Sequence, residues 1–322
     1  MTTARTLSAL ALAAASLFAL PAQALTVYSA GPGKLIETLA ADFKAKSGVQ
    51  VDVFQADTGK VMARLQAEAI NPRADVVISA SWDSAQDLDR RGMLVAHGSA
   101  NAQKVAPQYR QPNYVAQGLS VLSIVWNTRS GTPRPADWND LTAPAFKDKV
   151  TMPDPAQSGA SLDLLSALQQ RQSDKAWELF GRLKANGMVI SGPNAQAMNP
   201  VLQGAKAAVF GAVDYVALGS QAKGESIEVI FPKSGTVVAP RPMMVLKSSK
   251  AQDDARRFID FVLSPEGQAR VADAYLIPAR SDAAAKRTAI KDIQLLPEPQ
   301  GNENYASRAA LLHRFSTLFG RR

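Results

Sequence analysis

The stretch LTVYSAGPGKLIETLAADFKAKSGVQVDVF, residues 25–54, determines the fold that we expect for this chain. It begins with β-branched and aromatic residues over 25–30, a composition that favours a strand. A Gly-Pro-Gly turn follows, and Leu35, Leu39 and Phe43 then recur at intervals of four, which predicts an amphipathic helix. Another β-rich run ends the stretch. The order strand, helix, strand with short connections predicts the start of a parallel α/β sheet.

The pattern continues on the C-terminal side of this stretch. A second helix is expected after Thr58, and residues 74–79 (ADVVIS) form a third, buried strand. Two long β-rich runs follow, at 118–126 (GLSVLSIVW) and 236–246 (TVVAPRPMMVL), with a second α/β unit between them. The prolines of the later run indicate an edge or hinge strand. We therefore expect both runs to cross between two lobes.

The fold class that we predict is α/β, with two lobes that each contain a mainly parallel sheet flanked by helices. The first lobe is expected to comprise residues 25–122 and 242–322, including the C-terminal helices, and the second lobe residues 123–241. In the second lobe, one helix is expected to begin near Ser158 and another at Asn199.

The first 24 residues have the features of a secretory signal peptide. Arg5 supplies the positive charge, residues 7–20 form an apolar run, and Ala22-Gln23-Ala24 is a small-x-small cleavage site. The run is too short to span a bilayer, and Pro21 breaks a helix directly before the cleavage site, so a signal anchor is the less favoured alternative. We expect cleavage after Ala24 and a periplasmic location.

The charge of the chain gives a weaker indication. Its formal net charge of +8 at pH 7 comes from 36 Lys and Arg against 28 Asp and Glu. These basic residues are dispersed and are not interleaved with aromatics, which argues against a nucleic-acid partner. The excess suits either a solvated surface or the attraction of an anion into a cleft. There is no Cys, so we expect stability to come from burial without disulfides. The protein is expected to be a monomer.

Five segments together resemble the periplasmic ferric-ion-binding proteins, which belong to the family 1 extracellular solute-binding proteins. They are LTVYSA, ADVVIS, WNTRSGTPRPADWNDL, PDPAQSGAS and, as the strongest marker, FIDFVLSPEGQ at 258–268. The resemblance covers about residues 25–282. It implies a type 2 periplasmic binding protein, in which two hinged lobes close on a small solute and deliver it to the permease of an ABC importer.

Several predicted helix starts follow strands and carry small or hydroxyl residues. Free N–H groups and the positive end of the helix dipole make such starts anion sites, and ligands of α/β sheets bind beyond the carboxyl ends of the strands. The same residues are also ordinary N-caps, and most capped helices bind nothing. The residues that we predict to bind a ligand on this basis are Ser29, Gly31, Thr58, Gly59, Ser79, Ser158, Gly159, Ala160 and Arg241, with Lys34 or Lys60 nearby.

The resemblance adds to this set. Ser158-Gly159-Ala160 matches the segment that holds an anion in the ferric-binding relatives, and Asn194 resembles their anion-contacting Asn. A small anion such as a phosphate ester, phosphonate or carboxylate is therefore the solute that we expect. Its organic part would pack against Tyr215 or Trp82, although a Trp is more often part of the core.

Ferric iron is the alternative solute. The ferric-binding relatives offer adjacent Tyr residues with a His and a carboxylate, whereas the matching segment here has Asp214 beside Tyr215. Asp57 would be a third oxygen ligand. His97 and His313 lie outside the matching segments. Fe(III) would thus be bound, if at all, by an incomplete form of the family's ligand set.

Two other classes of function are alternatives to transport. No Gly-x-Ser-x-Gly, P-loop or His-Glu-x-x-His motif occurs. Without Cys and with only two His, which lie far apart in the sequence, most nucleophile–base pairs cannot be built, so an enzyme is not expected and no cofactor is implied. A sensor that binds a solute and signals to a membrane receptor stays open, because sensing and delivery use the same closed two-lobe form.

Overall fold

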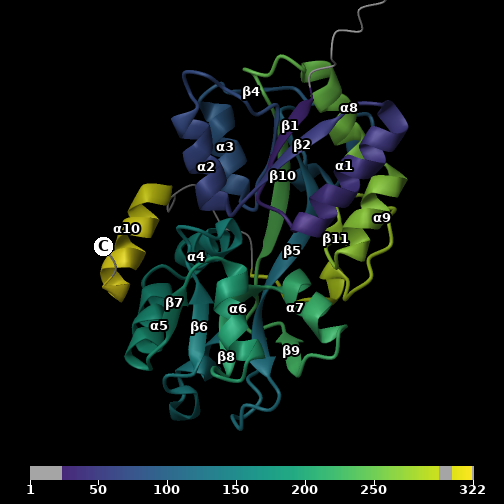
Figure 1. The fold of residues 1–322 in the computed structure, drawn as a ribbon. Coiled ribbons are helices and arrows are strands. Elements are labelled where there is room, and N and C mark those ends of the chain that lie inside the picture. The colour runs from purple at the N-terminus through teal and green to yellow at the C-terminus, as the bar shows by residue number, and fades with distance from the viewer. Residues whose placement is uncertain (1–23, 297–306, 321–322) are drawn as a thin grey trace, which may run out of the picture.

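The computed structural model describes residues 24–296 and 307–320, so residues 1–23 of the predicted signal peptide lie outside the described part. One continuous mixed sheet runs the length of the molecule, with helices on both faces (Figure 1). Its strands lie in the order β2-β1-β3-β10-β5-β8-β6-β7. These strands are β1 (Leu25–Ser29), β2 (Val51–Gln55), β3 (Val76–Ile78), β5 (Tyr114–Asn127), β6 (Val150–Pro153), β7 (Val189–Ser191), β8 (Ala208–Val213) and β10 (Val238–Leu246).

The remaining elements surround this path. The short strands β4 (Leu94–Val95) and β11 (Ile277–Pro278) pair with β10 and β5, and β9 (Ile227–Ile230) pairs with β5. The α-helices are α1 (Gly33–Ser47), α2 (Thr58–Ala67), α3 (Trp82–Arg90), α4 (Gly159–Gln172), α5 (Asp174–Ala185), α6 (Asn194–Leu202), α7 (Asp214–Gln221), α8 (Gln252–Val262), α9 (Pro265–Asp273) and α10 (Arg308–Phe319). Single 3-10 turns occupy Asn101–Lys104, Pro107–Tyr109, Trp138–Thr142, Pro144–Phe146 and Ile290–Asp292.

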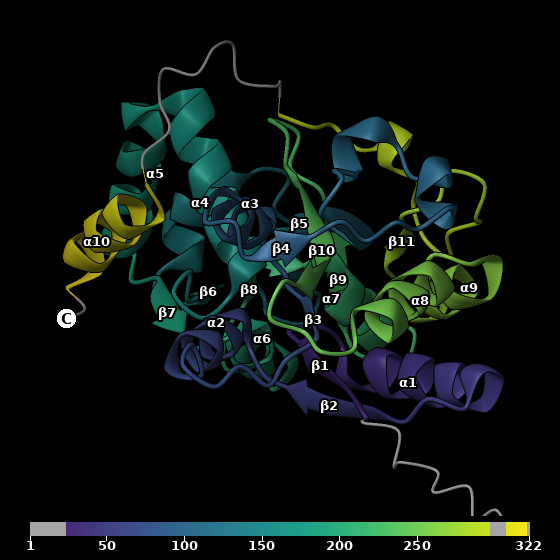
Figure 2. The same ribbon diagram turned by 90° about the horizontal axis from the view of Figure 1, so that it is seen from above.

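The first lobe has the predicted parallel βαβαβ unit. β1 pairs in parallel with β2 and β3, and β10 joins β3 antiparallel. Alternate residues of β3 face opposite cores: Val76 and Ile78 pack with α1, α8 and α9, while Val77 packs with α2 and α3. Figure 2 shows these two helical layers on either side of the strands. The period-two alternation of buried residues is what allows one strand to serve both layers.

The second lobe repeats this plan around other strands. β6 pairs in parallel with β7 and β8, while β8 and β9 run antiparallel to β5. Leu164, Leu168 and Phe180 of α4 and α5 cover one face, and Met198 of α6 packs on the other. The long strand β5 contributes to both lobes, since Leu119 packs in the first core and Leu122 in the second. A two-lobed fold crossed by long strands is therefore observed; the predicted lobe limits at 122/123 and 241/242 stay a prediction.

Several predictions need correction. β10 is not an edge strand, because it lies between β3 and β5. Its prolines fit there because the pairing with β5 shifts register between Pro240 and Pro242, where a strand interior can lack an N–H donor. The helix expected from Asn199 begins earlier, at Asn194. Helix α7 was not predicted at all, since its eight residues carry little amphipathic pattern.

The C-terminal tail also differs from the expectation. Of its described residues, only 308–319 form an α-helix. This helix, α10, packs through Leu311 and Phe315 against the core of α4 and α5, whereas the sequence grouped the whole tail with the first lobe. Both views place α10 beside α5 (Figures 1 and 2). The reason is that the apolar face of α10 packs against the second lobe and not against the first.

Candidate functional site

The parallel strands of the first lobe bring three predicted positions to one edge of the sheet. Ser29 is the last residue of β1, and hydrogen bonds join this end of β1 to the ends of β2 and β3. Ala56 N, just after β2, donates to Ser29 O at 3.1 Å, and Ala30 N donates to Ile78 O of β3 at 2.8 Å. Ser29 Oγ accepts from Gly31 N at 3.1 Å. The loops that carry Ser29, Thr58 and Ser79 therefore meet at this edge, as the sheet rule predicts.

Arg241 reaches the same edge from β10. Its side chain is only 1 % exposed, and its Nη2 donates to Ala30 O at 2.7 Å. A Cβ at Gly31 would lie 3.2 Å from this Nη2, so the glycine allows the guanidinium to lie close to the turn. Arg241 Nε forms no hydrogen bond, and no carboxylate among the described residues pairs with the guanidinium. The result is a buried positive charge without a counter-charge.

Tyr215 lies on the other side of Arg241. The guanidinium carbon is 5.8 Å from the centre of the Tyr215 ring, within cation–π range. The ring is half-buried and packs against the main cores of both lobes. Burial raises the pKa of the Tyr215 hydroxyl, and the positive charge of Arg241 opposes that shift. Tyr215 is therefore a neutral phenol placed between the lobes.

The second lobe contributes the start of α4. Ser158 is buried and is the N-cap, with its Oγ accepting from Ser161 N at 3.2 Å. Asn194, the first residue of α6, donates from Nδ2 to the same Oγ at 2.9 Å. Asn194 Oδ1 is buried and forms no hydrogen bond with a described residue. The two predicted anion-contacting segments, Ser158-Gly159-Ala160 and Asn194, are thus in direct contact.

Two predicted glycines bring the lobes together. A Cβ at Gly59 would lie 2.6 Å from Ala156 O, and Gly59 N donates to Gln157 O at 3.4 Å. A Cβ at Gly159 would lie 2.8 Å from Ser81 Cβ. Only a residue without a side chain fits at either position, because the opposing backbone is too close. The structure therefore has the lobes in contact, with both glycines at the contact.

Other predicted residues form local caps. Asp57 caps α2 through a 2.8 Å bond from Lys60 N, and its carboxylate pairs with Lys60 Nζ at 3.1 Å. Ser79 Oγ accepts from Ser81 N and lies 2.6 Å from Ser84 Oγ, within hydrogen-bond distance. Trp82 packs edge-on against Tyr114. These contacts are compatible with ordinary capping and core roles, the alternative that the sequence left open. Helices α1 and α6, by contrast, begin without a side-chain cap.

Asp214 lies beside Tyr215 in sequence but has other partners. Its carboxylate accepts from Val121 N at 2.9 Å and from Tyr215 N at 2.7 Å, and it pairs with Arg287 Nη1 at 2.5 Å. Both ionised groups are fully buried. Burial raises the pKa of Asp214 to about 6, against the lowering effect of Arg287. The sequence offered no signal for Arg287, because its partner comes from a distant segment.

A family model for the bacterial extracellular solute-binding proteins matches residues 71–297, which is most of the chain. This chain belongs to that family. It is a periplasmic solute-binding protein of the kind that serves ABC transporters. Within the described residues, no helix has both the length and the apolar character that a membrane crossing requires.

Relatives of this solute-binding protein include both expected ligand classes. The phosphoglycerate transport regulatory protein PgtC of Salmonella typhimurium is 27% identical over 253 residues, 69% of this chain but only 59% of that protein. The Fe(3+)-binding periplasmic protein of Serratia marcescens is 24% identical over 259 residues, 76% of this chain and 75% of that one.

Solved structures agree on the fold. The periplasmic binding protein AfuA of Actinobacillus pleuropneumoniae, with fructose-6-phosphate bound, superposes with a TM-score of 0.79 at 23% identity over 92% of this chain and 96% of that chain. The substrate-binding protein of an ABC transporter from Agrobacterium tumefaciens gives 0.83 at 21% identity, over 94% and 96%. At these identities the likeness establishes the two-lobed architecture alone.

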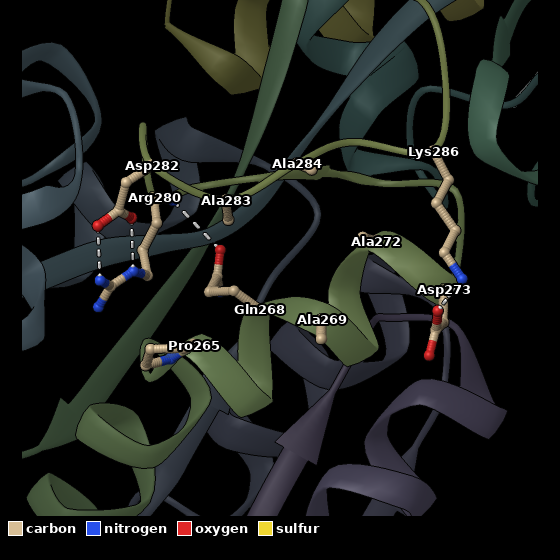
Figure 3. Close-up of a pocket in the computed structure, with 10 residues that line it drawn as sticks. All are labelled: Pro265, Gln268, Ala269, Ala272, Asp273, Arg280, Asp282, Ala283, Ala284 and Lys286. Atoms are coloured by element: carbon tan, nitrogen blue, oxygen red, sulfur yellow. Dashed lines mark hydrogen bonds and ion pairs between the residues drawn. The ribbon is translucent and has the colours of Figure 1, made fainter.

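A separate hollow of about 400 Å³ lies on the outer side of the first lobe, beside α9 (Figure 3). Its charged side chains pair with one another: Arg280 with Asp282 at 2.8 Å, and Lys286 with Asp273 at 2.5 Å. None of the residues predicted to bind ligand lines it. In the described part of the solute-binding protein, no three His, Asp or Glu side chains gather as a metal site would require.

Proposed function

We propose that this solute-binding protein captures a small organic anion, a phosphate ester, phosphonate or carboxylate, between its lobes and delivers it to an ABC permease. The observation that carries the proposal is Arg241. A guanidinium that is 1 % exposed and has no carboxylate partner among the described residues is costly to bury. A bound anion supplies the missing counter-charge.

The chemistry of the side chain favours an oxyanion in particular. A guanidinium presents a planar fork of N–H donors that matches two oxygens of a carboxylate or phosphate. Nη2 of Arg241 is taken by Ala30 O, and Nε is free. The uncapped N–H groups at the starts of α1 and α6 add donors of the same kind.

The organic part of the solute has candidate partners in Tyr215 and Asn194. The half-buried Tyr215 ring offers an apolar face with a neutral hydroxyl. Oδ1 of Asn194 needs a hydrogen-bond donor, because a buried polar atom left unpaired costs stability. A hydroxylated organophosphate would supply a donor to Asn194 Oδ1 and a carbon chain to pack on the Tyr215 ring. The name of PgtC refers to phosphoglycerate, and the AfuA structure has fructose-6-phosphate bound, which agrees with this choice.

Ferric iron is less well supported, although one relative is named for it. Fe(III) needs anionic oxygen ligands, and the carboxylates proposed for it are engaged: Asp214 with Arg287, and Asp57 with Lys60. The remaining ligand, Tyr215, would have to ionise, whereas burial raises its pKa. Binding iron would therefore require breaking two ion pairs.

Calorimetric titration of the purified protein would test the proposal. Fructose 6-phosphate, 3-phosphoglycerate, methylphosphonate, inorganic phosphate and ferric nitrilotriacetate would be compared. We expect an organic anion to bind, and Arg241→Gln to weaken it by about 100-fold or more, because the buried charge partner is lost. Tyr215→Phe should matter little for an anion but strongly for Fe(III). Tight iron binding that survives Arg241→Gln would reverse the assignment.

The role after binding also needs a test. Delivery to a permease is the role that we propose, while the regulatory name of PgtC favours solute sensing as a second candidate. Deleting the gene for this protein should abolish uptake of the radiolabelled solute if the protein serves transport. A transcriptional response to the solute that is lost in the deletion strain, with uptake unchanged, would indicate sensing.

A further inference from the structure

A carboxyl group of the second lobe lies at the start of a helix in the first lobe. Asp163, on α4, accepts a hydrogen bond of 2.7 Å at Oδ1 from Ser81 Oγ. Its Oδ2 lies 3.4 Å from Trp82 N, the first N–H of α3. Ser81 is the N-cap residue of α3 but forms no capping hydrogen bond of its own. The cap of this helix is therefore supplied across the lobes.

Residues of both lobes pack closely around this contact. Gly159, one turn before Asp163 on α4, lies against Ala80 and Ser81, where a Cβ would be 2.9 Å from Ala80 O. Ser81 is fully buried. Ser84 Oγ donates to Ser81 O at 2.7 Å and holds this turn in place. Because the partners are on different lobes, any separation of the lobes breaks the Asp163 contacts and exposes the carboxyl group to water.

Burial is the main influence on the charge of Asp163 in this arrangement. It raises the pKa of the carboxyl group to about 7, although Ser81 and Trp82 lower it through their hydrogen bonds. Two charged groups also face it: Asp83, on α3, raises the pKa, and Arg308, at the start of α10, lowers it. A hollow of about 730 Å³, lined in part by Asp83, Ser84 and Arg308, lies along the first turn of α3.

We propose that Asp163 is an interlobe latch, whose carboxyl group caps α3 when the lobes are closed and is released to water when they open. The latch makes closure depend on pH, because the closed state holds a proton on Asp163 that the open state gives up. The proposal does not depend on which solute the cleft takes, since neither Asp163 nor Ser81 is among the residues assigned to the solute.

The direction of the pH effect follows from the two states. An Asp in water has a pKa of about 4, and the closed state raises it to about 7. Between these values the closed state binds more protons than the open state, so closure is favoured as pH falls and is weakened as pH rises through 7. Below pH 4 and well above pH 7, closure should not depend on this group.

Distance measurement between spin labels would test the latch. The chain has no Cys, so Ile70→Cys in the first lobe and Val189→Cys in the second give two unique labelling sites. Both side chains are exposed, at 100% and 45%. Electron–electron distance distributions of the ligand-free protein would be recorded from pH 5.5 to 8.5. We expect the closed-to-open ratio to fall on the order of tenfold across this range.

Matched variants separate the latch from general effects of charge. Asp163→Asn keeps an acceptor for Ser81 but cannot ionise, so its ratio should not change with pH. Asp83→Asn, on the same helix start, should keep a pH dependence, moved toward lower pH because Asp83 no longer raises the pKa of Asp163. A ratio that is constant with pH in the unmodified protein, or that changes equally in Asp163→Asn, overturns the proposal.

A second variant covers the case in which Asp163→Asn does not fold, as judged by circular dichroism. Ser81→Ala removes the donor to Oδ1 from the opposite lobe and leaves Asp163 in place. Ser81→Ala should lower the closed fraction at every pH, and the closed fraction should still fall as pH rises. An unchanged closed fraction in Ser81→Ala would contradict the latch.

Discussion

Arg287 Nη1 lies 2.5 Å from Asp214 Oδ2, and neither side chain is exposed to solvent. The pair joins the first residue of α7 to a segment that follows β11. The same carboxylate accepts from Val121 N on β5, the strand that passes through both lobes. The pair therefore fixes the position of α7, and with it that of Tyr215, at the division between the lobes.

Removing one partner of this pair should be strongly destabilising. Asp214→Asn leaves the Arg287 guanidinium buried without a counter-charge, which typically costs about 3–5 kcal/mol. Urea denaturation followed by circular dichroism would measure the loss. The double variant Asp214→Asn with Arg287→Met removes both charges and should recover part of it. Equal losses in the single and double variants would mean that the unpaired charge of Arg287 is not what destabilises Asp214→Asn.

Ser158→Asp is expected to weaken anion binding without unfolding the protein. Asp is as good an N-cap as Ser, so α4 should still begin at the same place. Its negative charge would repel an anion near the start of α4, and we expect affinity for the anion identified by titration to fall by about tenfold or more. Ser166→Asp, on the same helix but further from its start, is the control. Unchanged affinity in Ser158→Asp would remove this helix start from the site.

Gly159→Ala should push the lobes apart. The added Cβ would lie 2.8 Å from Ser81 Cβ and 2.9 Å from Ala80 O, closer than carbon and backbone atoms approach. Small-angle X-ray scattering should therefore give a larger radius of gyration than for the unmodified protein. Gly181→Ala, on α5, meets nothing within 4 Å and should leave the radius unchanged. A normal radius in Gly159→Ala would show that the contact relaxes without opening.

Phe315→Ala tests the attachment of the C-terminal helix to the second lobe. The Phe315 ring is 3% exposed and meets Phe180 edge-on, with 5.6 Å between ring centres. Truncating a buried Phe typically costs about 3–5 kcal/mol, which chemical denaturation would detect. His313→Ala, at an exposed position of the same helix, should cost less than about 0.5 kcal/mol. A small loss in Phe315→Ala would mean that α10 is not part of the cooperative unit.

Local pattern was enough to predict much of the first lobe. The apolar spacing of Leu35, Leu39 and Phe43 predicted α1, and the run ADVVIS predicted β3, because each signal lies within a few neighbouring residues. The small residues after these strands predicted where the helices start. The pattern failed for α7, which is short and weakly amphipathic, and for β10, whose prolines are accommodated by a shift in register.

The sequence by itself determined the α/β plan, the family and the edge of the first-lobe sheet at which Ser29, Thr58 and Ser79 lie, because chain direction and strand order follow from local pattern. Only the tertiary structure decided the partners. Arg241 is buried beside Ala30, 211 residues away, and Asp163 meets Ser81, 82 residues away. No periodicity connects residues so far apart, since their contact depends on how the two lobes pack. The charge left unpaired at Arg241 and the half-buried carboxyl group of Asp163 are consequences of that packing.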